Sequence, residues 1–256
     1  MVHRRVAARL LIFAIVFAMI AGPALGNDFQ PMAVGHQWAY RISQSNEFRV
    51  GGQVVGREAK AGRYTRDVVR EGRRKDVPVP LFVIDDVRTW RGGAEPDRVS
   101  TLAADRGGAL LEYAMDLGEG LSIHTEPLVY LPARIKGGLS WHVGEVEIGT
   151  MTLTLEGEVL GLQDARTPMR TFERCLKVRY TGPVKGLVEL PEGRLPIRSG
   201  RLDVVQWFAP GVGVVLAEET VVLDVLTTQG VMTATTTDKY SLADYKVGSV
   251  PARQAR

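Results

Sequence analysis

Polar and apolar residues alternate along much of this chain, and this period of two restricts its fold more than any other feature. Residues 150–156 alternate without interruption, and residues 38–43 follow the same pattern. Because successive side chains of a strand point to opposite faces, the pattern predicts strands with one buried and one wet face. The apolar runs 80–87 and 214–226 predict strands that are buried more deeply.

Pairs of turn-forming residues separate these segments. Such pairs favour tight turns, and no segment after residue 27 carries a sustained helical pattern. The expected fold is therefore all-β, an antiparallel meander that forms a curved sheet, a half-barrel or a sandwich. The turn pairs are Gly51-Gly52, Gly92-Gly93, Gly107-Gly108, Gly137-Gly138 and Pro210-Gly211.

Two parts of the chain resemble each other, at about 30–116 and 131–225. Four motif pairs recur in the same order at offsets of 103 to 108 residues. They predict two repeats of about 100 residues, each a meander of five or six strands. The motif pairs are 35–40 with 138–143, 52–56 with 157–161, 63–64 with 170–172, and 107–112 with 211–216.

The first 26 residues have the three-part build of a secretory signal peptide. A basic start at residues 3–9 precedes an apolar run at 10–21, and small residues follow at 24 and 26. We expect cleavage after Gly26 and a periplasmic or extracellular protein. A membrane-spanning helix needs roughly 20 apolar residues, more than this run provides, so no transmembrane segment is expected after cleavage.

Processing would leave an all-β domain at 27–248 and a flexible tail at 249–256. The signal segment holds three arginines and no acidic residue, so the 32 basic residues fall by three to 29, equal to the 29 acidic ones. A nucleic-acid-binding protein needs a lasting positive excess. We therefore expect no nucleic acid partner.

One local charge excess remains between residues 49 and 75, where the sequence contains nine basic and three acidic residues. Such a cluster suits an anionic polymer, an anionic lipid or an acidic envelope protein. A solvated strand pair whose charges protect a sheet edge is the alternative. The candidate residues for an anionic partner are Arg63, Arg66, Arg70, Arg73, Arg74 and Lys75.

The tryptophans Trp38, Trp90, Trp141 and Trp207 recur on segments flanked by glycine. We interpret them as core residues that pin the sheet. If the sheet curves into a half-barrel, the same rings would line a cavity for an apolar ligand.

Motifs for catalysis or metal binding are missing from the sequence. There is no Gly-x-Ser-x-Gly motif, the histidines after residue 27 lack metal-ligand spacing, and the single cysteine, Cys175, fits a buried strand position. We predict no catalytic, metal-binding or cofactor-binding residue and no cofactor. Paired carboxylates remain as candidates for acid or base chemistry, namely Asp85-Asp86, Glu145 with Glu147, and Glu218-Glu219.

Several motifs together resemble the TapB-like bacterial envelope proteins, over roughly residues 30 to 220. They are residues 31–40, Leu131-Pro132 followed by Gly138-x-x-Trp141, residues 171–178 and residues 207–215. The resemblance implies a β-rich secreted or lipid-anchored envelope protein with no established activity. It brings no catalytic residue to this chain.

Three hypotheses for function follow. The favoured one is a non-enzymatic envelope scaffold that binds a partner protein or polymer. The second is a periplasmic carrier of lipid or another hydrophobic ligand. The third is a hydrolase of an envelope polymer that acts through two carboxylates.

Overall fold

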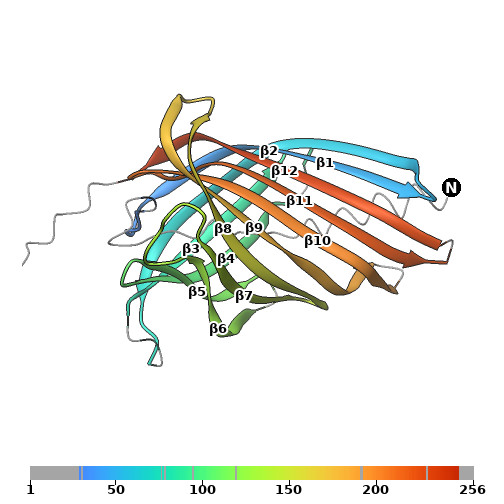
Figure 1. Ribbon diagram of the computed structural model, residues 1–256, viewed down its shortest axis with the longest axis horizontal. Helices are drawn as coiled ribbons and strands as arrows, with labels where there is room; N and C mark the ends of the chain where they lie inside the picture. The colour runs from blue at the N-terminus through green and yellow to red at the C-terminus, as the bar shows by residue number, and fades with distance from the viewer. Residues whose placement is uncertain are drawn as a thin grey trace, which may run out of the picture.

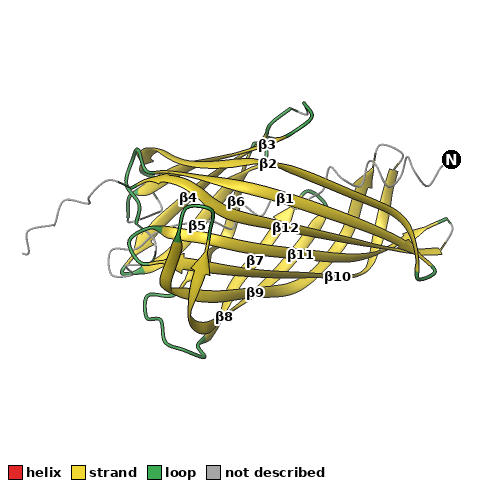
Figure 2. Ribbon diagram, turned by 90° about the horizontal axis from the view of Figure 1, so that it is seen from above, coloured by secondary structure: helices red, strands yellow, loops and turns green. Residues whose placement is uncertain are grey.

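Strands that are consecutive in the chain lie side by side in one curved sheet. The computed structural model describes residues 29, 31–75, 77, 79–93, 95–118, 120–190, 193–228 and 230–247. Within them, twelve strands pair in the order β6-β5-β4-β3-β2-β1-β12-β11-β10-β9-β8-β7. The sheet curls into a nearly closed barrel (Figures 1 and 2). The predicted signal peptide, 1–26, and the predicted tail, 249–256, lie outside the described residues.

All pairings are antiparallel, and β1 pairs with β12 to join the two halves of the chain. The strands are β1 (Gln37–Val50), β2 (Gln53–Gly72), β3 (Leu81–Trp90), β4 (Asp97–Arg106), β5 (Ala109–Asp116), β6 (Leu121–Leu131), β7 (Ser140–Ile148), β8 (Met151–Arg166), β9 (Thr171–Leu190), β10 (Gly193–Ala209), β11 (Gly213–Thr227) and β12 (Gly230–Lys246).

The predicted all-β meander is confirmed, and the sheet is a single curved one rather than a sandwich. Burial alternates along β1, where Trp38, Tyr40 and Ile42 are buried while Arg41 and Ser43 are exposed. Each predicted turn pair lies between strands, as with the left-handed Gly51-Gly52 between β1 and β2. The period of two therefore determines which side chains enter the barrel.

Each half of the chain contributes six strands, β1–β6 and β7–β12. Two of the four repeat motifs lie at equivalent places: Gly35 and Gly138 precede β1 and β7, and the last pair forms the β4–β5 and β10–β11 turns. In the second pair, however, Gly52 lies in a turn and Gly157 lies within β8. The internal duplication stays a prediction.

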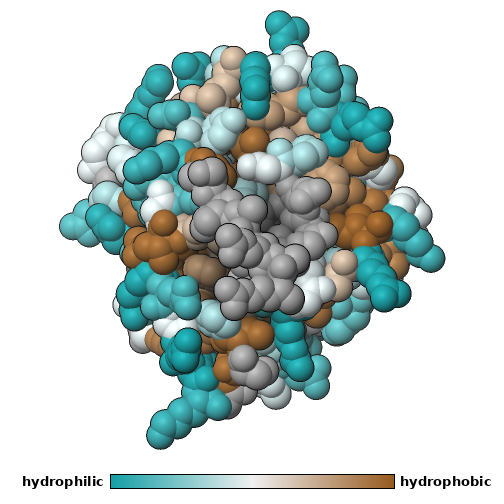
Figure 3. Space-filling model, turned by 90° about the vertical axis from the view of Figure 1, so that its left-hand side faces the viewer, coloured by the Kyte–Doolittle hydropathy of each residue, from teal (hydrophilic) through white to brown (hydrophobic). Residues whose placement is uncertain are grey.

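Side chains from all twelve strands form the main core inside the sheet. A smaller core around Val77, Leu81, Leu111 and Tyr113 lies on the other side of β5, which is buried on both faces. Charged and polar residues crowd the outline of the molecule seen from one end, with apolar residues between them (Figure 3). No helix in the described part of the chain has the length and apolar character needed to span a membrane.

Candidate functional site

The edge strands β6 and β7 are in contact but share no backbone ladder in the described part of the chain, and we call this boundary the seam. Pro127 in β6 has no N–H to donate, and the register of β6 against β5 shifts beside it. The register of β7 against β8 shifts at Gly144. Pro127 and these register shifts interrupt the two edges locally, so the described strands β6 and β7 do not close into a ladder with each other.

Two aromatic side chains hold part of the seam together in place of a ladder. The indole Nε1 of Trp141 donates to the carbonyl oxygen of Val129 at 2.7 Å, and the hydroxyl of Tyr180 donates to the carbonyl oxygen of Tyr130 at 3.0 Å. Gly157 lies between the two rings in the ladder, and a Cβ there would be 2.3 Å from Trp141 Cζ2. We call Trp141, Gly157 and Tyr180 the clasp.

The seam also contains a pocket of about 510 Å³ between β6 and β7. Three exposed glutamates line it, Glu126, Glu145 and Glu147, and none has an ion-pair partner in the described part of the chain. The exposed apolar side chain of Ile123 also lines the pocket, and Leu121 on the same strand is half exposed. The pocket therefore combines free negative charge with apolar surface at two unpaired sheet edges.

A buried acid lies behind one wall of this pocket. His124 Nε2 is 2.9 Å from Glu112 Oε1, and Glu112 is almost fully buried. Burial raises the pKa of Glu112, while the hydrogen bond with His124 opposes this shift. The pair links the pocket wall to the barrel interior.

The barrel interior holds a second group of charges. Arg66 Nη2 is 2.8 Å from Asp86 Oδ2, and the Tyr64 hydroxyl donates to Asp86 Oδ1 at 2.6 Å. The side chains of Arg66 and Asp86 are each 1% exposed. Burial raises the pKa of Asp86, and the charge of Arg66 opposes that shift.

Arg66 was predicted as a candidate residue for an anionic partner, but its side chain is buried and so is not placed to meet one. It lies in β2 in phase with the buried Tyr64 and Val68, so it points into the barrel. Arg63 lies on the outer face of β2, Arg70, Arg73 and Lys75 are exposed, and Arg74 is half-buried.

A buried carboxylate pair lies across β11 and β12. Glu219 and Asp238 are directly opposite each other in the ladder, and Arg88 Nη1 is 3.6 Å from Asp238 Oδ2. Arg88 also donates to the hydroxyl of Tyr240. Burial and the charge of Asp238 raise the pKa of Glu219 well above its ordinary value, and Arg88 opposes them.

This pair predicts a pH dependence of stability. A carboxyl whose pKa is raised on folding stabilises the fold below its unfolded pKa of about 4.3, and that stability is lost as the pH rises through the folded pKa. The contribution of Glu219 to the stability of the wild-type protein should therefore be lost progressively as the pH rises above about 4.3. Glu219→Gln should flatten this loss, measured as the urea midpoint against pH.

The matched control for that test is Glu218→Gln, because Glu218 points outward and pairs with Lys239 at 2.9 Å. It should keep the wild-type pH profile. An equally steep loss in Glu219→Gln would contradict the assignment.

The four tryptophans make separate local contacts. Trp38, Trp90 and Trp207 belong to the main core, and Trp141 is partly buried against it. Trp38 Nε1 donates to the carbonyl oxygen of Val212 at 2.7 Å, which ties β1 to the β10–β11 turn. The rings thus connect strands at different places in the barrel.

The other candidate carboxylates are divided by strand alternation. Asp86 and Glu219 point inward, whereas Asp85 and Glu218 point outward. Among the described residues, no group of three or more His, Cys, Asp or Glu side chains is placed to hold a metal ion. Cys175 is buried.

No family model and no curated protein matches this chain. Three solved structures are similar to it. One is a Bacteroides fragilis protein described as exported with a YmcC-like fold, at 14% identity and TM-score 0.40, covering 85% of this chain and 98% of that one.

Another is a Parabacteroides distasonis protein described as a lipoprotein, at 14% identity and TM-score 0.44, covering 88% of this chain and 100% of that one. The third is an outer membrane channel from Pseudomonas putida, at 8% identity and TM-score 0.33, covering 84% of this chain and 98% of that one. These similarities concern the path of the backbone only, and nothing about activity is inferred from them.

Proposed function

We propose that the protein is an exported, non-enzymatic binding protein of the bacterial envelope, and that it holds an extended segment of a partner protein at the seam. The observation that carries the proposal is the pair of unpaired edges, β6 and β7, around a pocket of about 510 Å³. An extended peptide can add to an exposed sheet edge through main-chain hydrogen bonds, while pockets select its alternate side chains.

The side chains of the seam indicate the chemistry of that segment. Glu126, Glu145 and Glu147 have no cationic partner within the described part of the chain, so they favour lysine or arginine on the segment. Ile123 and Leu121 are exposed by 56% and 50%, and they favour apolar residues beside the basic ones. The preferred segment is therefore an extended one in which basic and apolar residues alternate.

Binding of a labelled peptide tests this proposal. A ten-residue peptide of alternating lysine and valine should bind the wild-type protein, and its glutamate–valine counterpart should not. The triple variant Glu126→Gln, Glu145→Gln, Glu147→Gln should weaken binding about tenfold, because exposed ion pairs contribute roughly 0.2 to 1 kcal/mol each. Fluorescence anisotropy measures the affinities.

The exposed, outward Glu218 offers a matched control. Glu218→Gln should bind the lysine–valine peptide as the wild type does. Equal binding of both peptides, or of the triple variant, would contradict the proposal. Steady cleavage of the peptide by the pure protein would contradict the non-enzymatic part.

The envelope address rests on the predicted signal peptide. Cleavage after Gly26 would give an exported product that begins Asn27-Asp28-Phe29. N-terminal sequencing of protein from the periplasm or medium should read these residues. A product that begins at residue 1 would contradict export by cleavage.

A second candidate function is carriage of a hydrophobic molecule at one end of the barrel. The strands β1, β2 and β8–β12 are longer than β3–β7, and their ends extend past the shorter strands (Figure 1). Their inward residues there include Phe48, Leu223, Val225 and Met232, which are buried in the main core, so a ligand would have to displace part of that packing. Native mass spectrometry of the exported protein should detect a bound lipid if this function holds.

A further inference from the structure

A second pocket, of about 760 Å³, lies on the other side of the sheet from the main core. Arg41 of β1 and Arg63 of β2 line it together with Arg91, which follows β3. Small residues form much of the rest of its lining, and their short side chains leave space between the long arginine side chains. These small residues are Ala39, Ala61, Gly62 and Ala243.

The three arginines are exposed, and no side-chain hydrogen bond or ion pair joins any of them to another residue in the described part of the chain. Arg41 and Arg63 are direct partners in the β1–β2 ladder. Like charges directly opposite each other on a sheet face are destabilising. Among the described residues that line the pocket, Asp244 is the only carboxylate, so positive charge is in excess there.

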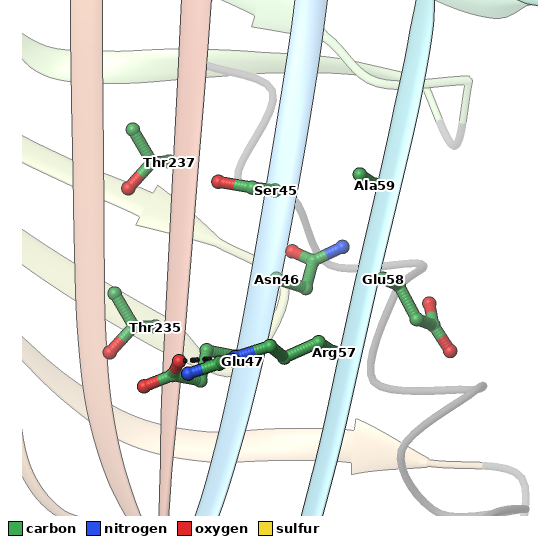
Figure 4. A pocket seen from close by; sticks show the side chains of 8 residues that line it. All are labelled: Ser45, Asn46, Glu47, Arg57, Glu58, Ala59, Thr235 and Thr237. Atoms are coloured by element: carbon green, nitrogen blue, oxygen red, sulfur yellow. Dashed lines mark hydrogen bonds and ion pairs between the residues drawn. The ribbon is translucent and has the colours of Figure 1, made fainter. Parts of the chain in front are cut away.

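A nearby arginine of the same strand shows a different arrangement. Arg57 of β2 reaches across to Glu47 of β1, with 2.8 Å between Nε and Oε2 (Figure 4). That pair lines another groove on β1, β2 and β12. Arg57 is thus neutralised by a carboxylate on the neighbouring strand. Opposite Arg63, the neighbouring strand carries Arg41 instead of a carboxylate.

We propose that the Arg41–Arg63–Arg91 pocket binds a phosphate group. A guanidinium presents its N–H donors in a planar fork that matches phosphate oxygens, and three such groups around one concave site suit a compact anion. Binding would also relieve the repulsion between Arg41 and Arg63. This site lies on different strands from the seam and is independent of the function proposed there.

Two probes test the site and distinguish the source of the phosphate. Inorganic phosphate, titrated by calorimetry, represents a soluble ligand. Vesicles of phosphatidylglycerol, compared with vesicles of phosphatidylcholine in a sedimentation assay, represent a lipid headgroup. Wild-type protein should bind at least one of the two phosphate probes, more weakly as salt is added.

The double variant Arg41→Gln, Arg63→Gln should lose this binding by about tenfold or more, since it removes two charge-assisted contacts. Arg57→Gln is the matched control, because it removes an outward arginine of the same strand that already has a partner. It should bind as the wild type does. The double variant and Arg57→Gln change only exposed residues, so both proteins should keep the wild-type circular dichroism spectrum. This control distinguishes loss of binding from loss of folding.

If the double variant loses binding to inorganic phosphate, the ligand of the site is a soluble phosphate. If it loses binding only to the anionic vesicles, the ligand is a lipid headgroup. Either result supports the site. Failure of the wild-type protein to bind both probes would overturn the proposal. So would equal binding by the double variant, or an equal loss in Arg57→Gln.

Discussion

Asp86→Ala is expected to destabilise the protein by about 3 to 5 kcal/mol, because removing one partner of a buried ion pair leaves the other charge uncompensated. The Arg66 side chain is 1% exposed, so water cannot replace the carboxylate. The Tyr64 hydroxyl would lose its acceptor as well. Urea unfolding at neutral pH measures the effect.

The neighbouring residue provides the control. Asp85 points outward and accepts a hydrogen bond from Ser100 at 2.7 Å, so Asp85→Ala should cost about 1 kcal/mol or less. The double variant Arg66→Met, Asp86→Leu should recover part of the stability, since it removes the uncompensated charge of Arg66 while the Tyr64 hydroxyl still lacks its acceptor. A stable Asp86→Ala protein would show that the pair is solvated.

Gly157→Val is expected to disturb the clasp and with it the seam. Even a single Cβ at this position would lie 2.3 Å and 2.4 Å from two atoms of the Trp141 indole, so the ring must move. Overpacking of this kind costs about 1 to 3 kcal/mol. Displacement of the ring also removes its hydrogen bond to Val129, so binding of the lysine–valine peptide should weaken.

Two further variants separate crowding from loss of the hydrogen bond. Trp141→Phe keeps a ring over Gly157 and removes the donor, which should cost about 1 kcal/mol. Gly72→Val adds a side chain at a strand glycine with open space around it, and it should change the unfolding midpoint little. A normal unfolding midpoint and normal peptide binding in Gly157→Val would contradict the role given to the clasp.

Alternation and turn pairs predicted the strands well because both are local properties of the chain. Residues 151–156 of the alternating segment lie in β8, and the apolar run 214–226 lies in β11. The interior charges were harder to predict, because a count of basic residues does not consider the face on which each one lies. Arg66 shares the phase of Tyr64 and Val68, and that phase was the available signal.

The seam was only partly predictable. The spacing of Glu145 and Glu147 placed both on one face of a strand, and both line the pocket. The position of β6 opposite these two glutamates depends on the curvature that accumulates over twelve strands. No local sequence pattern contains that information. Gly157 resembled a repeat motif in the sequence, whereas its position beneath the Trp141 ring emerges only in the folded sheet.

Amide hydrogen exchange on β6 and β7 tests the central claim most directly, with and without the lysine–valine peptide. If the segment adds to the open edges, amides in Leu121–Leu131 and Ser140–Ile148 should exchange more slowly when the peptide is present, while those in β10 stay unchanged. The glutamate–valine peptide should have no effect. Unchanged exchange in both edge strands, at a peptide concentration that saturates binding, would contradict the account.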